Sequence, residues 1–149
     1  MSRKTIVLPE RFIFSTQYDV LYSDVNSANH LGADRALPIA MEAQLRFIKH
    51  LGYDNATAFE DAGLIMVHSE VQYLAEATYS DRLKIELAID NPLEKSFELI
   101  YRIMNLSKSN EMARVVTTLV FFDYQLKRVV AVPDTFLERV RTVESADYE

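Results

Sequence analysis

The sequence contains no cysteine and only three glycines, and these two shortages exclude several kinds of site. Without cysteine the chain can form no disulfide, no thiolate zinc site and no cysteine nucleophile. The three glycines, Gly32, Gly52 and Gly63, cannot make a dinucleotide-binding fingerprint or a phosphate-binding loop. Lack of cysteine is typical of a reducing compartment, so we expect a cytoplasmic protein.

Long apolar runs and an excess of positive charge are also missing. No stretch approaches the roughly 20 apolar residues of a membrane span, and none near the N-terminus resembles a signal peptide, which predicts a soluble protein. The net charge is −6, so the field of the molecule repels phosphate backbones and we expect no nucleic-acid partner. The three histidines lack metal-binding spacing, and we expect no metal.

Length and composition predict one domain over residues 1–149, because 149 residues with 49% hydrophobic content can bury a substantial core. Residues 12–22 alternate in polarity and predict a first strand. An amphipathic helix is predicted from Ala36 to Leu51, with Pro38 near its start and Gly52 as its left-handed cap. Its apolar residues recur at spacings of four, four and three, at Leu37, Met41, Leu45 and Ile48.

A short helical stretch is predicted near residues 57–62, and four alternating segments with turn signals follow Gly63. In the first of these strands Val67, Ser69, Val71 and Tyr73 share one face. The last, residues 112–123, is apolar on both faces, which is typical of a central strand or a subunit contact. This order predicts an α+β domain with a curved antiparallel sheet of five to six strands wrapped around one long central helix. We expect the open face to be buried by a second copy through Ile100, Met104, Val116, Val120 and Phe122.

A polar cluster, residues 23–32, lies directly before the predicted helix. It places the carboxylate of Asp24, the amide of Asn26 and the imidazole of His30 beside a helix start. A helix N-terminus carries about half a positive charge and free N–H donors, which can polarise a carbonyl and stabilise the oxyanion formed on attack. The cluster therefore favours chemistry on a carbonyl without a serine or cysteine nucleophile.

The order and spacing of three motifs resemble those of hotdog-fold thioesterases related to 4-hydroxybenzoyl-CoA thioesterase. Members of that family typically show Asp-x-Asp-x-x-Gly-His-Val, then Glu-Ala-Arg on a helix, then Tyr-Leu-x-Pro-Ala-x-x-Gly-Asp. The chain reads Asp24-Val25-Asn26-Ser27-Ala28-Asn29-His30-Leu31, then Glu42-Ala43-Gln44, then Tyr73-Leu74-Ala75-Glu76-Ala77-Thr78-Tyr79-Ser80-Asp81. The resemblance covers roughly residues 18–133.

The resemblance implies a dimer or tetramer that hydrolyses acyl thioesters of coenzyme A or acyl carrier protein in a site between subunits. Coenzyme A then enters as part of the substrate, and no cofactor is expected. The residues expected to act in catalysis are Asn26, Asp24, Glu42 and His30. Those expected to contact the substrate are Gly32, Ala33, Met41, Leu45 and His68, the last at the surface or at a subunit interface.

Asn26 stands where the family has its usual catalytic carboxylate. An amide cannot act as a base near neutral pH, although it can hold a water or a carbonyl. Another group must then take the proton, and Glu42 on the helix is one candidate. Each residue also has a structural interpretation: Asp24 can cap a turn, Glu42 can pair with Arg46, and His30 can support the loop.

Two other functions remain open. Hotdog hydratases carry Asp-x-Asn-Pro-x-His, and Asp24-Val25-Asn26 begins that pattern, but Ser27 replaces the proline and His30 comes one residue late. The other alternative is a domain that binds acyl groups without turnover, having lost its carboxylate at Asn26. A turnover assay over several acyl-CoAs and one enoyl-CoA distinguishes the three.

Overall fold

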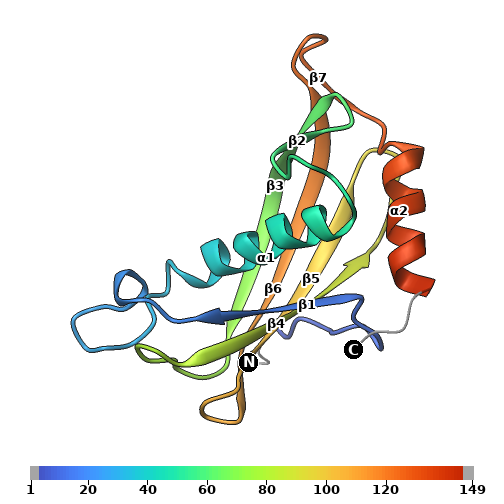
Figure 1. Cartoon of the computed structure of the whole chain (residues 1–149). Coiled ribbons are helices and arrows are strands. Elements are labelled where there is room, and N and C mark those ends of the chain that lie inside the picture. The colour runs from blue at the N-terminus through green and yellow to red at the C-terminus, as the bar shows by residue number, and fades with distance from the viewer. Residues whose placement is uncertain (1–3, 146–149) are drawn as a thin grey trace.

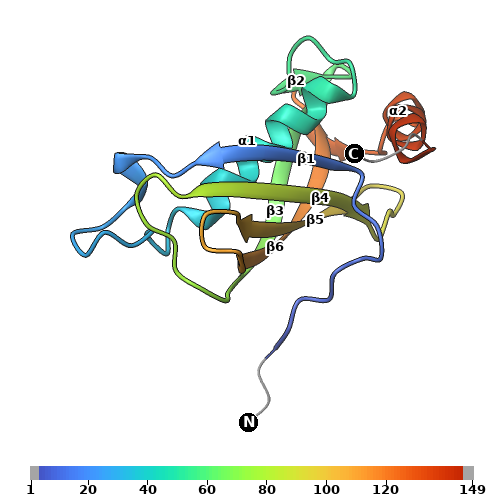
Figure 2. The same cartoon turned by 60° about the horizontal axis from the view of Figure 1, so that its bottom comes forward.

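A computed structural model describes residues 4–145 as one seven-stranded antiparallel sheet with two helices on the same face (Figures 1 and 2). The strand order is β1-β4-β5-β6-β3-β2, and β7 pairs with β6. No helix in this part of the chain is long and apolar enough to cross a membrane. The elements are β1 (Phe14–Asp19), α1 (Ala36–His50), β2 (Ala58–Phe59), β3 (Ala62–Tyr73), β4 (Arg82–Asp90), β5 (Phe97–Asn105), β6 (Asn110–Asp123), β7 (Arg128–Val130) and α2 (Asp134–Ser145), with a 3₁₀ turn at Tyr22–Asp24.

This architecture confirms the predicted α+β hotdog fold, with an antiparallel sheet curled around α1. The sheet exceeds the predicted five to six strands because β2 and β7 add short strands of two and three residues. The first strand is shorter than predicted, and its C-terminal part is replaced by the 3₁₀ turn. β6 lies between β5 and β3, which confirms a central position for the strand that is apolar on both faces.

α1 begins and ends where the sequence predicts, but it buries a different stripe. Its C-terminal Gly52 has φ 99°, the left-handed conformation expected of the cap. Met41 is 42% exposed, and Leu37 and Leu45 are only half-buried. The helix approaches the sheet closely because small side chains lie at the centre of its buried stripe, which comprises Ala36, Ile39, Ala40, Ala43, Gln44, Phe47 and Ile48.

A β-bulge in β3 changes the predicted alternation of that strand. Met66 pairs with Leu119 and His68 with Thr118, so Val67 is the extra residue. Val67 is therefore 57% exposed, whereas Val71 further along β3 packs against the core. The bulge removes Val67 from the face that the sequence pattern assigns to it.

The segment at residues 57–62 is not helical as predicted but forms a tight hairpin. Phe59 of β2 pairs with Ala62 of β3, which leaves Glu60 and Asp61 as a two-residue turn. Their φ angles are 56° and 54°, the positive values that this kind of hairpin turn requires at both central positions. The prediction failed because neither residue is the glycine or asparagine that usually marks such a turn.

The helix α2 is absent from the sequence-based prediction, which contains one long helix and a short helical stretch, both before the block of strands. Its Phe136 is fully buried and lies 5.2 Å from the ring of Phe97 and 5.3 Å from the ring of Phe121, centroid to centroid. Phe59 joins the same cluster. α2 thus closes the end of the curved sheet beyond the C-terminus of α1 (Figure 1).

The N-terminal segment, residues 4–12, crosses the sheet face opposite the helices (Figure 2). The backbone N–H of Ile6 donates to Gln72 Oε1 at 3.0 Å, and Arg114 donates to the carbonyl of Ile6 at 2.9 Å. On this face Ile100 is 4% exposed and Val120 8% exposed within the single chain. These two residues therefore need no second copy to bury them, unlike the expectation from the sequence.

Candidate active site

The polar cluster before α1 folds into a small hairpin that Asn26 closes. Val25 and Leu31 form an isolated bridge, and the N–H of Asn26 donates to the carbonyl of His30 at 2.9 Å. The side-chain Oδ1 of Asn26 accepts the N–H groups of Ala28 at 3.0 Å and His30 at 3.2 Å. Asn26 thus holds the backbone of His30 from two sides.

Asp24 is buried beneath this hairpin, where three donors surround its carboxylate. It accepts hydrogen bonds from the hydroxyl of Tyr18 at 2.7 Å, the N–H of Leu21 at 2.9 Å and Nε of Arg35 at 3.0 Å. Burial acts to raise the pKa of Asp24, but these hydrogen bonds and the charge of Arg35 outweigh it and lower the pKa below its ordinary value. Burial and the bond to Asp24 raise the pKa of Tyr18 to about 12. These contacts tie β1, the 3₁₀ turn and the first residue before α1 together.

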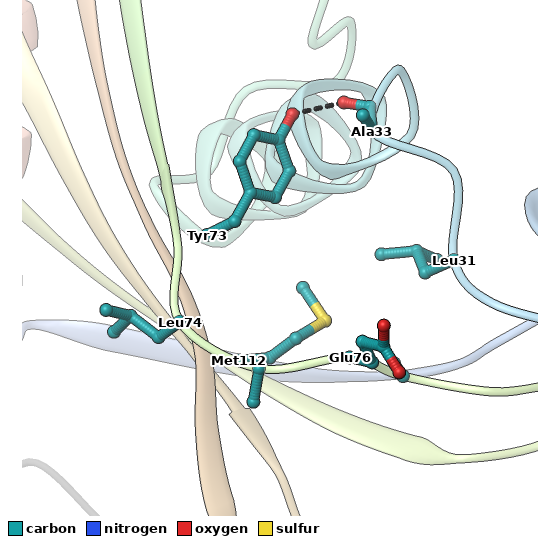
Figure 3. Close-up of a pocket in the computed structure, with 8 residues that line it drawn as sticks. Leu31, Ala33, Tyr73, Leu74, Glu76 and Met112 are labelled. Carbon is teal, nitrogen blue, oxygen red and sulfur yellow. Dashed lines mark hydrogen bonds between the residues drawn. The ribbon is translucent and has the colours of Figure 1, made fainter.

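A pocket of about 310 Å³ lies between the hairpin and the segment that follows β3 (Figure 3). Leu31 donates its N–H to the carbonyl of Ala77 at 2.8 Å, and the hydroxyl of Tyr73 donates to the carbonyl of Ala33. These two bonds fix the opposite walls of the pocket to each other. The lining is largely apolar and comprises Leu31, Ala33, Tyr73, Leu74, Ala75, Glu76, Ala77 and Met112.

The start of α1 comes three residues after Ala33, which lines this pocket, and it has no side-chain cap. Arg35, the residue before the first turn, makes no capping hydrogen bond, and Pro38 has no N–H to donate. Within residues 4–145 the N–H groups of Ala36 and Leu37 donate to no acceptor, and Ala36 is fully buried whereas Leu37 is half-buried. Figure 3 shows Ala33 and Tyr73 in front of the α1 coil. The helix start therefore offers the N–H group of Leu37 as a donor for a carbonyl oxygen.

His30 lies against a carboxylate that was not predicted from the sequence. Its Nε2 lies 3.2 Å from Oε2 of Glu76, whose side chain lines the pocket. Glu76 occupies the position where the related family has proline, and that substitution was the only signal that the sequence offered. Tyr73 and Met112 also line the pocket, and neither was selected from the sequence.

The remaining residues selected from the sequence are spread over several surfaces. Ala33 lines the pocket, while Gly32 donates its N–H to the carbonyl of Asp24 at 2.9 Å. Glu42 lies half-buried on α1, 3.9 Å from Arg46, and Met41 and Leu45 lie outside the pocket lining. His68 is on the outer face of the sheet, where it pairs with Glu70 at 3.2 Å.

No group of three or more potential metal ligands of the His, Cys, Asp or Glu type occurs within residues 4–145. The expected absence of a metal stays a prediction.

The model of the thioesterase-like superfamily matches residues 20–140, which is most of the chain, and the chain belongs to this superfamily. This membership confirms the family that the motifs indicated and the expectation of an enzyme of the thioesterase class. A comparison with curated proteins found no match.

Three solved structures illustrate the shared fold. A 1,4-dihydroxy-2-naphthoyl-CoA thioesterase from Synechocystis is 20% identical with a TM-score of 0.79, covering 89% of this chain and 98% of its own. A Thermus thermophilus thioesterase complexed with coenzyme A and zinc is 18% identical with a TM-score of 0.80, covering 94% and 100%. A variant 4-hydroxybenzoyl-CoA thioesterase bound to 4-hydroxybenzoyl-CoA is 19% identical with a TM-score of 0.76, covering 85% and 97%. At these identities the likeness concerns the fold.

Proposed function

We propose that the protein hydrolyses acyl thioesters of coenzyme A or acyl carrier protein in the pocket at the start of α1. One observation carries this proposal: Ala33 lines a largely apolar pocket of about 310 Å³ and lies three residues before the uncapped N-terminus of α1. An apolar wall suits an acyl group, and free N–H donors suit the carbonyl that must be attacked.

In this reaction the thioester carbonyl oxygen accepts a hydrogen bond from the N–H group of Leu37, a half-buried residue in the first turn of α1. Water attacks the carbonyl carbon, negative charge develops on that oxygen, and the carbon–sulfur bond then breaks to release a thiol and a carboxylic acid. Donors aimed at a developing oxyanion typically contribute roughly 10²-fold or more in rate. The positive end of α1 adds to this stabilisation.

Asn26 contributes as a donor rather than as a base. Its Oδ1 is occupied by two backbone N–H groups, so the side-chain NH₂ group is the part left for substrate or water. An amide nitrogen donates hydrogen bonds and has no accessible basicity near neutral pH. Asn26 therefore orients a reacting oxygen and fixes the hairpin.

Asp24 has a structural role in this proposal. Its carboxylate is buried and already accepts three hydrogen bonds, and its lowered pKa makes it a weak proton acceptor. Glu42 is accessible, but it is paired with Arg46 on the helix surface. The group that takes the proton from water therefore has to be sought nearer the pocket.

The test is a turnover assay with short, long and aromatic acyl-CoAs, together with one enoyl-CoA. Because the chain has no cysteine, a thiol-reactive dye reports only the released coenzyme A. We expect thiol release with at least one acyl group. Hydration of the enoyl-CoA without thiol release would indicate a hydratase, and tight binding without turnover would indicate a binding domain.

The variant Asn26→Ala should lower turnover by roughly 10²-fold, because the hairpin loses its closure and the substrate loses a donor. Asn55→Ala is the matched control. Asn55 Oδ1 also accepts two backbone N–H groups, those of Thr57 and Ala58, in a loop far from the pocket in sequence and outside its lining.

A further inference from the structure

We propose that His30 is the base that takes the proton from the attacking water and that Glu76 is the positioning residue that holds its imidazole. This inference rests on the proposed thioester hydrolysis and names the proton acceptor of that site. In this proposal an imidazole does the work of the carboxylate that the related family has at the position of Asn26. The imidazole and the carboxylate that holds it come from two segments far apart in the sequence.

The first observation is the contact itself. Nε2 of His30 lies 3.2 Å from Oε2 of Glu76, and within residues 4–145 the other ring nitrogen, Nδ1, has no hydrogen-bond partner. A carboxylate close to one ring nitrogen favours the tautomer in which that nitrogen carries the proton and the other nitrogen is the free acceptor. Nδ1 is then the atom available to a water molecule.

The second observation is the location of the pair. Glu76 lines the pocket, and so does Leu31, the neighbour of His30 (Figure 3). The imidazole is 42% exposed and the side chain of Glu76 is 71% exposed, so water can reach both. The pair is therefore at the rim of the pocket that we assign to the acyl group.

The third observation is that the backbone of His30 is fixed. Asn26 donates to its carbonyl at 2.9 Å and accepts its N–H at 3.2 Å. Both bonds involve main-chain atoms of His30, so they persist when its side chain is replaced. Asn26, which stands where the family has its catalytic carboxylate, thus fixes the backbone of His30. His30 in turn takes over the role of that carboxylate as proton acceptor.

The proton balance follows the reaction. The water oxygen bonds to the carbonyl carbon while its proton passes to Nδ1 of His30. When the carbon–sulfur bond breaks, the imidazolium returns that proton to the sulfur, and the products are a carboxylic acid and a free thiol. The negative charge of Glu76 stabilises the imidazolium that exists between these two steps.

The test is a double-mutant cycle on turnover with the acyl-CoA that the protein hydrolyses fastest. His30→Ala should lower kcat by about 10²-fold or more, the usual contribution of a general base, and imidazole added to the buffer should restore part of it. Glu76→Gln keeps a similar shape but loses the charge, and we expect a loss of about tenfold in kcat with KM nearly unchanged.

The decisive comparison is Glu76→Gln in the His30→Ala background, where it should change kcat less than about twofold because the group it positions is absent. The matched control is Glu70→Gln, which breaks the other His–Glu pair, also 3.2 Å long, on the outer face of the sheet. It should leave kcat unchanged.

Three results would overturn the inference. They are turnover that survives both His30→Ala and His30→Gln, a failure of imidazole to raise the rate of His30→Ala, and an equal loss from Glu76→Gln in both backgrounds. Each would leave the proposed hydrolysis standing. Absence of turnover by the unchanged protein would overturn the proposed function and this inference together.

Discussion

At the scale of single residues, Asn26 decides how the site differs from its relatives. Its Oδ1 closes the hairpin, and its NH₂ group is left to donate. An aspartate can accept the same two backbone bonds, but its second oxygen would face the reacting carbonyl as an acceptor. Oδ1 of Asn26 therefore closes the hairpin, and its NH₂ group donates to the substrate. A substitution that keeps the oxygen and removes the NH₂ group tests the second role alone.

We predict that Asn26→Asp lowers turnover by roughly tenfold, because it replaces a donor by a negative charge beside the developing oxyanion. The hairpin should stay folded, since the two backbone bonds to Oδ1 remain possible. Steady-state kinetics with matched circular dichroism spectra would check this. A rise of tenfold or more would instead mark Asn26 as a degenerate catalytic carboxylate position.

Asp81 gives a second prediction, concerning stability in acid. Its carboxylate accepts bonds from the N–H of Thr78 at 2.9 Å and Nδ2 of Asn105 at 2.8 Å, and it pairs with Lys108 at 2.9 Å. Burial acts to raise the pKa of Asp81, but these partners lower it to about 2 from an ordinary 3.8. The folded state therefore holds this proton less tightly than the unfolded state does.

With the folded pKa below the unfolded one, the stabilisation is complete above about pH 5 and is lost as the pH falls toward 2. We expect Asp81→Asn to reduce the free energy of unfolding by about 1 to 2 kcal/mol at pH 7 and much less at pH 2. Urea unfolding across this pH range measures the difference. An equal loss at both pH values would show that the ionised form is not what stabilises the fold.

The residues of the site were predicted unevenly, for a physical reason. Asn26 and His30 lie in one short segment, so their proximity could be read from the sequence. The pair between His30 and Glu76 joins residues 46 positions apart, and the sequence has no local pattern for it. The buried ring of donors around Asp24 likewise depends on Tyr18 and Arg35 from different elements.

At the scale of secondary structure, periodicity predicted the long strands and α1, and it failed where a single residue breaks the pattern. The bulge at Val67 shifts the alternation of β3, and the turn at Glu60 and Asp61 uses positive φ angles without glycine. α2 was missed although Asp134 follows Pro133 and buried Phe136 and Val140 are four residues apart, a helical signal. Phe136 and Val140 are buried in the hydrophobic core, and this burial holds α2 against the sheet.

We predict that Phe136→Ala destabilises the protein by about 3 to 5 kcal/mol, because the fully buried ring packs against three other phenylalanines. Urea unfolding monitored by circular dichroism measures this loss. Leu126→Ala, at a residue that is 57% exposed, is the control and should change stability by less than about 0.5 kcal/mol. A loss below about 1 kcal/mol for Phe136→Ala would mean that α2 packs only loosely.

At the scale of the whole molecule, β3 leaves one edge of the sheet open. Of its twelve residues only Ala62 and Gly63 pair with β2, so within residues 4–145 the stretch from Leu64 to Tyr73 has no strand beside it on that edge. An open edge of this length favours pairing with another strand. The N-terminal segment already covers part of the outer face, which removes one reason to expect a tetramer.

We propose a homodimer formed by antiparallel pairing of β3 with its copy, and we predict twice the chain mass by light scattering at micromolar concentration. Val67→Lys places a charge on the bulged, exposed residue of that edge and should shift the mass toward the monomer. Lysine at Leu126, an exposed position outside the unpaired stretch of β3, is the control. A monomeric mass for the unchanged protein would contradict the proposal.

The proposed reaction is direct attack by water on a thioester held at the start of α1. It is tested most directly by a single turnover in H₂¹⁸O with the protein in excess over acyl-CoA. Direct attack by water predicts that the released acid carries one ¹⁸O atom and that the protein carries none. Unlabelled acid together with ¹⁸O in a protein carboxylate, such as that of Glu42 or Glu76, would contradict it, because a carboxylate nucleophile would then have formed a covalent acyl-enzyme.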